Sequence, residues 1–139
     1  MGLLIDSTML VRAERRRQTP AQLVAALALH WGGDTELALS VMTAGELLHG
    51  CWRADTPARR ARREEFVEAV LAAIPAIPIT LEVMRVFAQV DAQLSSAGAR
   101  IPTSDLLIAA TALCRGDQVV SDDPRHFERV PGLTLLRLE

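Results

Sequence analysis

Five short apolar runs, the first four of them separated from one another by helical patterns, constrain the fold of this chain more than any other feature. The runs contain almost no alternating polar residues, which is typical of strands that are buried on both faces of a parallel sheet. Strands of this kind alternating with helices predict a three-layer α/β sandwich, with helices flanking a central, mainly parallel sheet of about five strands. The predicted strands are residues 3–5, 37–42, 77–79, 119–120 and 133–138.

The helical patterns between these runs have recognisable starts and stops. The second begins with Thr19 as N-cap, Pro20 at its first position and Gln22 three residues after the cap, and it stops at a pair of glycines. Thr80 is the predicted cap of the fifth helix. At 139 residues and 50% hydrophobic residues, we expect the whole chain, 1–139, to form one domain. The predicted helices are 9–17, 20–30, 44–53, 56–74, 80–98 and 104–115.

Composition excludes several classes of protein. The net charge of -2 gives no overall indication of nucleic-acid binding, and all 15 basic residues are arginine. A chain without lysine lacks the side chain that a P-loop and a Schiff-base enzyme both require. Cys51 and Cys114 match neither a zinc-binding spacing nor a disulfide framework, so we interpret them as buried, reduced thiols. The chain shows no secretory signal and no apolar run long enough to span a membrane, which favours a cytoplasmic protein.

Four acidic residues lie where the predicted strands end or a helix begins. Asp6 and Asp123 follow two of the apolar runs, Glu46 lies shortly after another, and Asp105 is in the first turn of the last long helix. Because the carboxyl ends of strands in open α/β folds converge on one crevice, we expect these carboxylates to lie close together. Asp122 stands beside Asp123, so which of the two faces the crevice is open.

Each of these acids also has a purely structural interpretation. Thr43 and Glu46 have the spacing of a capping box, Asp6 and Asp123 are possible N-caps, and Asp105 suits a helix dipole. Together, however, four carboxylates would repel one another unless a cation lies among them. Oxygen-only ligands favour Mg²⁺ or Mn²⁺, as one ion or two. The sequence alone therefore leaves two hypotheses: a metal-dependent enzyme, or a non-catalytic α/β binding module whose acids cap helices.

Four segments in this order carry a resemblance to a known family: "LLIDST" (3–8), "TAGELLHG" (43–50), "IPTSDLLIAATAL" (101–113) and "VVSDDPRHFERVPGL" (119–133). Over essentially its whole length the chain resembles PIN-domain ribonucleases of the VapC type, the toxins of bacterial toxin-antitoxin pairs. The resemblance implies an endoribonuclease that uses Mg²⁺ or Mn²⁺ to activate water, a homodimer, and a cognate antitoxin of the VapB type. It implies no role at a membrane.

The resemblance also assigns roles to residues. It implies that Asp6, Glu46 and Asp105 are metal-binding catalytic acids and that Asp123 occupies the place of a fourth, which the family often has as Asn. Ser7 or Thr8, and Ser121, match hydroxyl positions that support these acids. His126 departs from the pattern, because many relatives have Asp there.

Two further features have competing interpretations. The arginine groups at 15–17 and 59–63 either hold the phosphates of RNA or form solvated helix faces. Trp31 and Trp52 are predicted to be core or interface anchors rather than platforms for bases, since only 4% of the residues are aromatic. A phosphoacceptor domain, similar to response-regulator receivers, also places acids at strand ends, but such domains use a lysine that this chain lacks.

Overall fold

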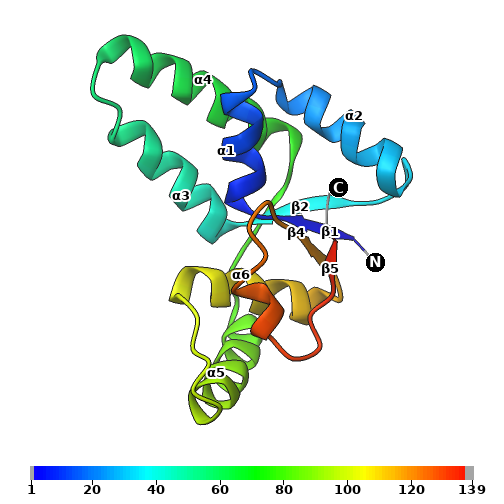
Figure 1. Ribbon diagram of the computed structural model, residues 1–139. Helices are drawn as coiled ribbons and strands as arrows, with labels where there is room; N and C mark the ends of the chain where they lie inside the picture. The colour runs from blue at the N-terminus through cyan, green and yellow to red at the C-terminus, as the bar shows by residue number, and fades with distance from the viewer. Residues whose placement is uncertain (1, 137–139) are drawn as a thin grey trace.

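The computed structural model describes residues 2–136. Its centre is a parallel sheet with the strand order β3-β2-β1-β4-β5 (Figure 1). The predicted α/β fold class is confirmed, and β1 lies in the middle of the sheet with β2 on one side and β4 on the other. Residues 137–138 of the last predicted strand lie outside the described residues. The strands are β1 (Leu3–Ile5), β2 (Leu37–Ser40), β3 (Ala76–Ile77), β4 (Gln118–Val120) and β5 (Leu135–Leu136).

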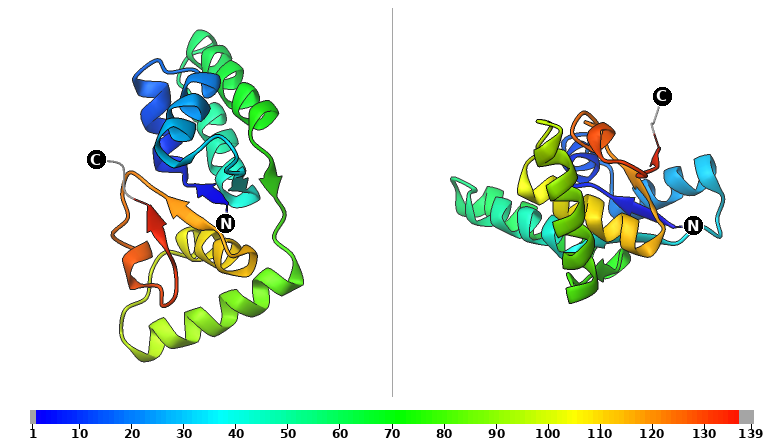
Figure 2. Two further views of the ribbon diagram at one scale, coloured as in Figure 1. Left: turned by 90° about the vertical axis from the view of Figure 1, so that its right-hand side faces the viewer. Right: turned by 90° about the horizontal axis from the view of Figure 1, so that it is seen from below.

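Helices cover both faces of this sheet (Figures 1 and 2). Leu3 and Ile5 of β1 face a core formed with α1 to α4, whereas Leu4 between them faces a second core formed with α5, α6 and η1. This division follows from the two-residue period of a strand, which sends successive side chains to opposite faces. The helices are α1 (Ser7–Arg15), α2 (Pro20–Trp31), α3 (Val41–Trp52), α4 (Pro57–Ala73), α5 (Leu81–Ser96), α6 (Thr103–Arg115) and the short 3-10 helix η1 (Phe127–Arg129).

The predicted helix starts are confirmed at α2 and α5. Thr19 and Gln22 form the predicted reciprocal capping box of α2, and the Thr80 hydroxyl accepts from the backbone N–H of Val83 at the start of α5. The start of α3 was predicted wrongly. Its cap is Ser40, whose hydroxyl accepts from Met42, so the helix begins at Val41 and the preceding strand ends earlier than predicted.

That shift also removes the predicted capping box of Thr43 and Glu46. Thr43 lies inside α3, is fully buried, and its Oγ1 has no hydrogen-bond partner. The capping box was predicted from the spacing of Thr43 and Glu46. Because α3 begins before Thr43, the backbone N–H group that such a box would use is already bonded within the helix. Glu46 is therefore available for another role.

The remaining predictions about single residues have mixed outcomes. Both cysteines are free thiols, but only Cys51 is buried, and Cys114 is partly exposed. Trp31 packs partly buried against the first core as predicted, whereas Trp52 exposes 72% of its surface and is not a core residue. Within residues 2–136, no helix has both the length and the apolar character needed to cross a bilayer.

Candidate active site

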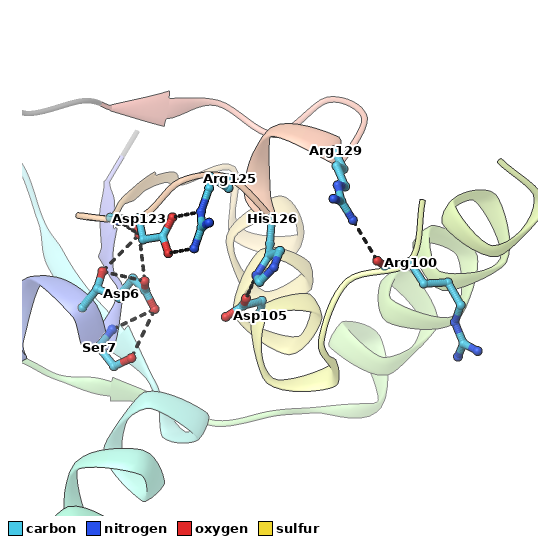
Figure 3. Close-up of polar contacts among 10 residues, drawn as sticks. Asp6, Ser7, Arg100, Asp105, Asp123, Arg125, His126 and Arg129 are labelled. Carbon is cyan, nitrogen blue, oxygen red and sulfur yellow. Dashed lines mark hydrogen bonds and ion pairs between the residues drawn. The ribbon is translucent and has the colours of Figure 1, made fainter. Parts of the chain in front are cut away.

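Asp6 occupies the single position between β1 and α1, at the carboxyl edge of the sheet. Its side chain is almost completely buried, and it accepts hydrogen bonds from the Ser7 backbone N–H at 2.8 Å, from the Thr8 hydroxyl at 2.9 Å and from the Ser121 hydroxyl at 2.8 Å (Figure 3). Asp6 thus caps α1, as one interpretation predicted. The hydroxyl support predicted from Thr8 and Ser121 is also present, and it fixes the orientation of this carboxylate.

The hydrogen bonds to Asp6 do not offset its burial. Burial is the largest influence and raises the pKa of Asp6, and the negative charge of Asp105 raises it further, while the bonds from Ser121, Thr8 and Ser7 act in the opposite direction. The charged form of Asp6 is therefore destabilised in this position. A neighbouring positive charge would stabilise it.

Glu46 projects from α3 toward the same edge. Burial raises its pKa to about 7, and the charges of Asp6 and Asp105 contribute in the same direction, opposed by a hydrogen bond from the Ser7 side chain. The Glu46 Oε1 atom is buried and has no hydrogen-bond partner. An unpartnered, buried carboxylate oxygen beside two other acids is costly to the fold, which marks this position as a candidate functional group.

Asp105 lies in the first turn of α6, as predicted, and reaches the site from the opposite face of the sheet. Its Oδ2 atom is 2.6 Å from Nδ1 of His126, in the segment between β4 and η1 (Figure 3). The Asp105 side chain is 23% exposed, so it remains accessible from solvent. His126 thus orients one oxygen of Asp105 and leaves the other available.

Asp122 and Asp123 follow β4 and have different surroundings. Both oxygens of Asp123 accept from the Arg125 guanidinium at 2.7 Å, which lowers the pKa of Asp123, and Asp122 accepts from Arg12 at 2.7 Å. The prediction that Asp123 caps a helix is wrong, because η1 begins only at Phe127 and the carboxylate binds an arginine side chain instead. Which of the two acids faces a metal stays open.

The predicted gathering of four acids is therefore only partly met. The charges of Asp6, Glu46 and Asp105 act on one another, but within residues 2–136 no three Asp, Glu, His or Cys side chains form a ready-made metal-binding group. The donor chemistry nevertheless fits a hard cation, since all the donors are carboxylate oxygens. A divalent ion would give Glu46 Oε1 a partner and would relieve the repulsion that adds to burial in raising the pKa values of Asp6 and Glu46.

Sequence reasoning missed two contacts at this edge. The pairs of Asp105 with His126 and of Arg12 with Asp122 join residues 21 and 110 positions apart, so no local spacing indicates them. His126 was singled out by its departure from the family pattern, and its proximity to the acids is now explained by the packing of η1 against α6. Helix α1 similarly brings Arg12 to the segment after β4.

Comparison with known proteins decides the family. The PIN domain model matches residues 3–133. The chain belongs to the PIN-domain family. Its similarity to VapC-type members is also confirmed: it is 28% identical to ribonuclease VapC1 of Rickettsia felis over 136 residues, covering 98% of this chain and 96% of that protein. It is likewise 28% identical to ribonuclease VapC5 of Mycobacterium tuberculosis over 120 residues, covering 86% of this PIN-domain chain and 82% of that protein.

Solved structures agree on the fold. The structure of VapBC2 from Rickettsia felis bound to a promoter DNA fragment contains a chain that superposes with a TM-score of 0.87 at 20% identity, covering 100% of both chains. A chain in the structure of VapBC-1 from nontypeable Haemophilus influenzae gives a TM-score of 0.82 at 18% identity, covering 99% of this chain and 98% of that one. At these identities the likeness confirms the PIN-like architecture of the chain.

Proposed function

We propose that the protein is a Mg²⁺- or Mn²⁺-dependent endoribonuclease and the toxin component of a toxin-antitoxin pair. The observation that carries the proposal is the burial of Asp6 and Glu46 beside Asp105: burial, with a smaller contribution from the neighbouring carboxylate charges, raises the pKa of Asp6 and brings that of Glu46 to about 7. Carboxylates with raised pKa values in one crevice indicate a functional site. The names of the relatives, ribonuclease VapC1 and ribonuclease VapC5, support RNA as the substrate.

Asp6, Glu46 and Asp105 are the proposed ligands of the ion. When bound, Mg²⁺ or Mn²⁺ polarises a phosphodiester and lowers the pKa of an attacking water. Ser121 holds the Asp6 carboxylate in place, and His126 holds Asp105. Glu46, whose buried Oε1 has no other hydrogen-bond partner, and Asp105 are the alternative carboxylates for orienting the attacking water.

The role of Asp123 as a fourth ligand stays a prediction, because its carboxylate is bound by Arg125. The competing hypothesis, a binding module whose acids are helix caps, is supported only at Asp6. Glu46 lies inside α3, and the residue at the N-cap of α6 is Pro102 rather than Asp105. A capping role therefore accounts for one of the three coupled acids.

The proposed partner is an antitoxin of the VapB type. The supporting observation is that chains of the same fold occur in VapBC complexes from Rickettsia felis and Haemophilus influenzae. A homodimer remains an expectation from the resemblance, and a cytoplasmic location remains an expectation from the sequence. Exposed apolar side chains on α3 and α5, among them Leu48, Leu81 and Met84, are available for a subunit contact.

Asp6→Asn tests the proposed function. The substitution removes the charge and keeps the size of the side chain, so we expect the fold to persist and RNA cleavage in Mn²⁺ to fall at least about a hundredfold, since even indirect supports of metal ligands contribute 10- to 100-fold. Cleavage of labelled RNA and the circular dichroism spectrum are measured together. Asp91→Asn, which removes a charge from α5 in the other layer, is the matched control. Unchanged cleavage by Asp6→Asn at equal Mn²⁺ would contradict the proposal.

A further inference from the structure

The connection between α3 and α4 carries a concentration of positive charge. The two helices run antiparallel, and their connection projects away from the sheet (Figures 1 and 2). We define the hairpin tip as residues 52–63, which contain five arginines and one acidic residue, Asp55. Arg59, Arg60 and Arg63 are paired with Asp55, Glu64 and Glu14, and among the described residues no ion pair is formed by the other two arginines of the tip, Arg53 and Arg62.

An exposed tryptophan lies at the start of this surface. Trp52 is 72% exposed, and the Arg60 guanidinium lies over its ring with the Cζ atom 3.8 Å from the ring centroid. Arg60 is itself held by Glu64, from Nε to Oε1 at 2.9 Å. The ring therefore has a cation on one face and much of its remaining surface open to solvent.

A groove runs from the hairpin tip toward the candidate active site. It has a volume of about 360 Å³, and its lining includes Arg53 at the tip and Glu46 at the site. Because Glu46 and Trp52 are six residues apart on one helix, they are separated by about 9 Å along its axis. Within residues 2–136, the side chains of Arg15 and Arg53 in this groove make no hydrogen bond or ion pair, so two unneutralised cations lie beside the path.

We propose that the hairpin tip and this groove bind single-stranded RNA, with phosphates on Arg53 and Arg15 and a base stacked on the open face of Trp52. Arginine pairs with phosphate through two parallel hydrogen bonds, and aromatic side chains stack on any base without regard to sequence. The inference rests on the proposed function for its ligand, RNA, and deepens it by naming an unpaired strand and its path to the acids.

The same observations disfavour other ligands. In double-stranded RNA the bases are stacked on each other and offer no open face to Trp52. Trp52 is followed directly by Arg53 and covered by Arg60, so an apolar protein segment docked on the ring would have to desolvate these cations without neutralising them. Cations around one isolated aromatic ring suit a polyanion that carries flat aromatic groups.

Binding is tested by fluorescence anisotropy of a fluorescein-labelled, mixed-sequence oligoribonucleotide in EDTA, so that affinity is measured without cleavage. Trp52→Ala is expected to weaken binding about tenfold, and Trp52→Phe to retain most of the affinity because it keeps an aromatic face. Arg53→Gln is expected to weaken binding and to reduce the slope of log affinity against log salt by about 0.7. Arg85→Gln, the same charge change on α5, is the matched control and is expected to change neither value.

Stacking also has a spectroscopic signature. In Trp31→Phe protein, Trp52 is the sole tryptophan, and we expect its fluorescence to be quenched as the oligoribonucleotide is added. In Trp52→Phe protein the sole tryptophan is Trp31, which is partly buried against the first core, and no quenching is expected. The duplex formed from the same oligonucleotide and its complement is expected to quench neither protein. This measurement does not depend on the stability of the alanine variant.

The possible results separate this inference from the proposed function. Equal RNA affinity of wild-type and Trp52→Ala protein, without quenching of Trp52, overturns the inference even if Mn²⁺-dependent cleavage is found. The expected affinities and quenching, with no cleavage in Mn²⁺, support the inference and count against the proposed function. If Trp52→Ala changes the sedimentation coefficient of the protein but not its RNA affinity, the hairpin tip is a subunit interface and the inference is wrong.

Discussion

The acidic residues at the carboxyl edge of the sheet fall into two groups with opposite electrostatics. Asp6 and Glu46 are withdrawn from solvent, and burial together with neighbouring carboxylates raises their pKa values. Asp122 and Asp123 are more exposed, each accepts from an arginine, and the pKa of Asp123 is lowered. The second group is neutralised within the chain itself, whereas the first is destabilising unless a cation binds. The comparison locates the candidate metal site among the unneutralised acids.

The largest expected effect compares one acid from each group. Glu46→Gln removes a coupled carboxylate, so we expect RNA cleavage in Mn²⁺ to fall at least about a hundredfold, on the same scale as other metal-site losses. Asp123→Asn removes a carboxylate that Arg125 already neutralises, and we expect a loss of less than about tenfold. Initial rates of cleavage of one labelled RNA measure both. Equal losses in the two variants would show that Asp123 is a full member of the site and would break the comparison.

A second expected effect concerns stability with and without metal. Mn²⁺ that binds only the folded state stabilises it by about 2.7 kcal/mol at a concentration a hundredfold above its Kd. We expect thermal melting of the wild type to shift upward with Mn²⁺, of Glu46→Gln to shift much less, and of Asp123→Asn to shift nearly as much as the wild type. A wild-type melting temperature that is indifferent to Mn²⁺ and Mg²⁺ would instead favour a role for the acids as helix caps.

The difference between the two groups of acids is only partly visible in the sequence. The apolar runs and the capping residues Thr19 and Thr80 predict the architecture, because these signals are local and the chemistry of strand and helix ends is independent of the rest of the chain. The same reasoning predicts that Asp6 and Asp105 lie at one edge. It does not predict which acids are neutralised, because Arg12 reaches Asp122 across 110 positions.

Local signals also mislead where two of them overlap. Ser40 and Thr43 are both good N-caps, and the spacing of Thr43 to Glu46 favoured the later one. Ser40 caps the helix, since its hydroxyl accepts from Met42, and α3 begins at Val41 rather than at the predicted residue 44. The exposure of Trp52 was missed for a different reason, because which face of the last turn of α3 is covered depends on how α4 packs against it.

The raised pKa of Glu46 predicts a pH dependence of stability in the metal-free protein. Glu46 has an ordinary pKa of 4.5 and a pKa of about 7 in the fold, so between these values the folded state binds a proton that the unfolded state has released. Stability from this group is therefore complete below about pH 4.5 and is lost as the pH rises through about 7. Because the carboxyl is only partly buried, we expect a loss on the order of 1 kcal/mol.

Urea unfolding in EDTA at pH 5, 6, 7 and 8 measures this loss. Glu46→Gln is expected to flatten the decline but not to abolish it, because the raised pKa of Asp6 acts in the same direction. Asp123→Asn is expected not to flatten it, since the pKa of Asp123 is lowered. Parallel curves for wild type and Glu46→Gln would mean that the Glu46 carboxyl is well solvated, and the distinction between the two groups would weaken.

The smallest expected effect is the loss of an arginine from the neutralised group. Arg125 is 79% exposed and Asp123 is 44% exposed, so their ion pair is surrounded by water and contributes little to stability. Arg125→Gln should leave the urea midpoint of unfolding nearly unchanged. A larger destabilisation would mean that Asp123 depends on its arginine to tolerate the neighbouring acids. In that case the two groups would form one charged network, and the prediction that Asp123 is a fourth metal ligand would be favoured.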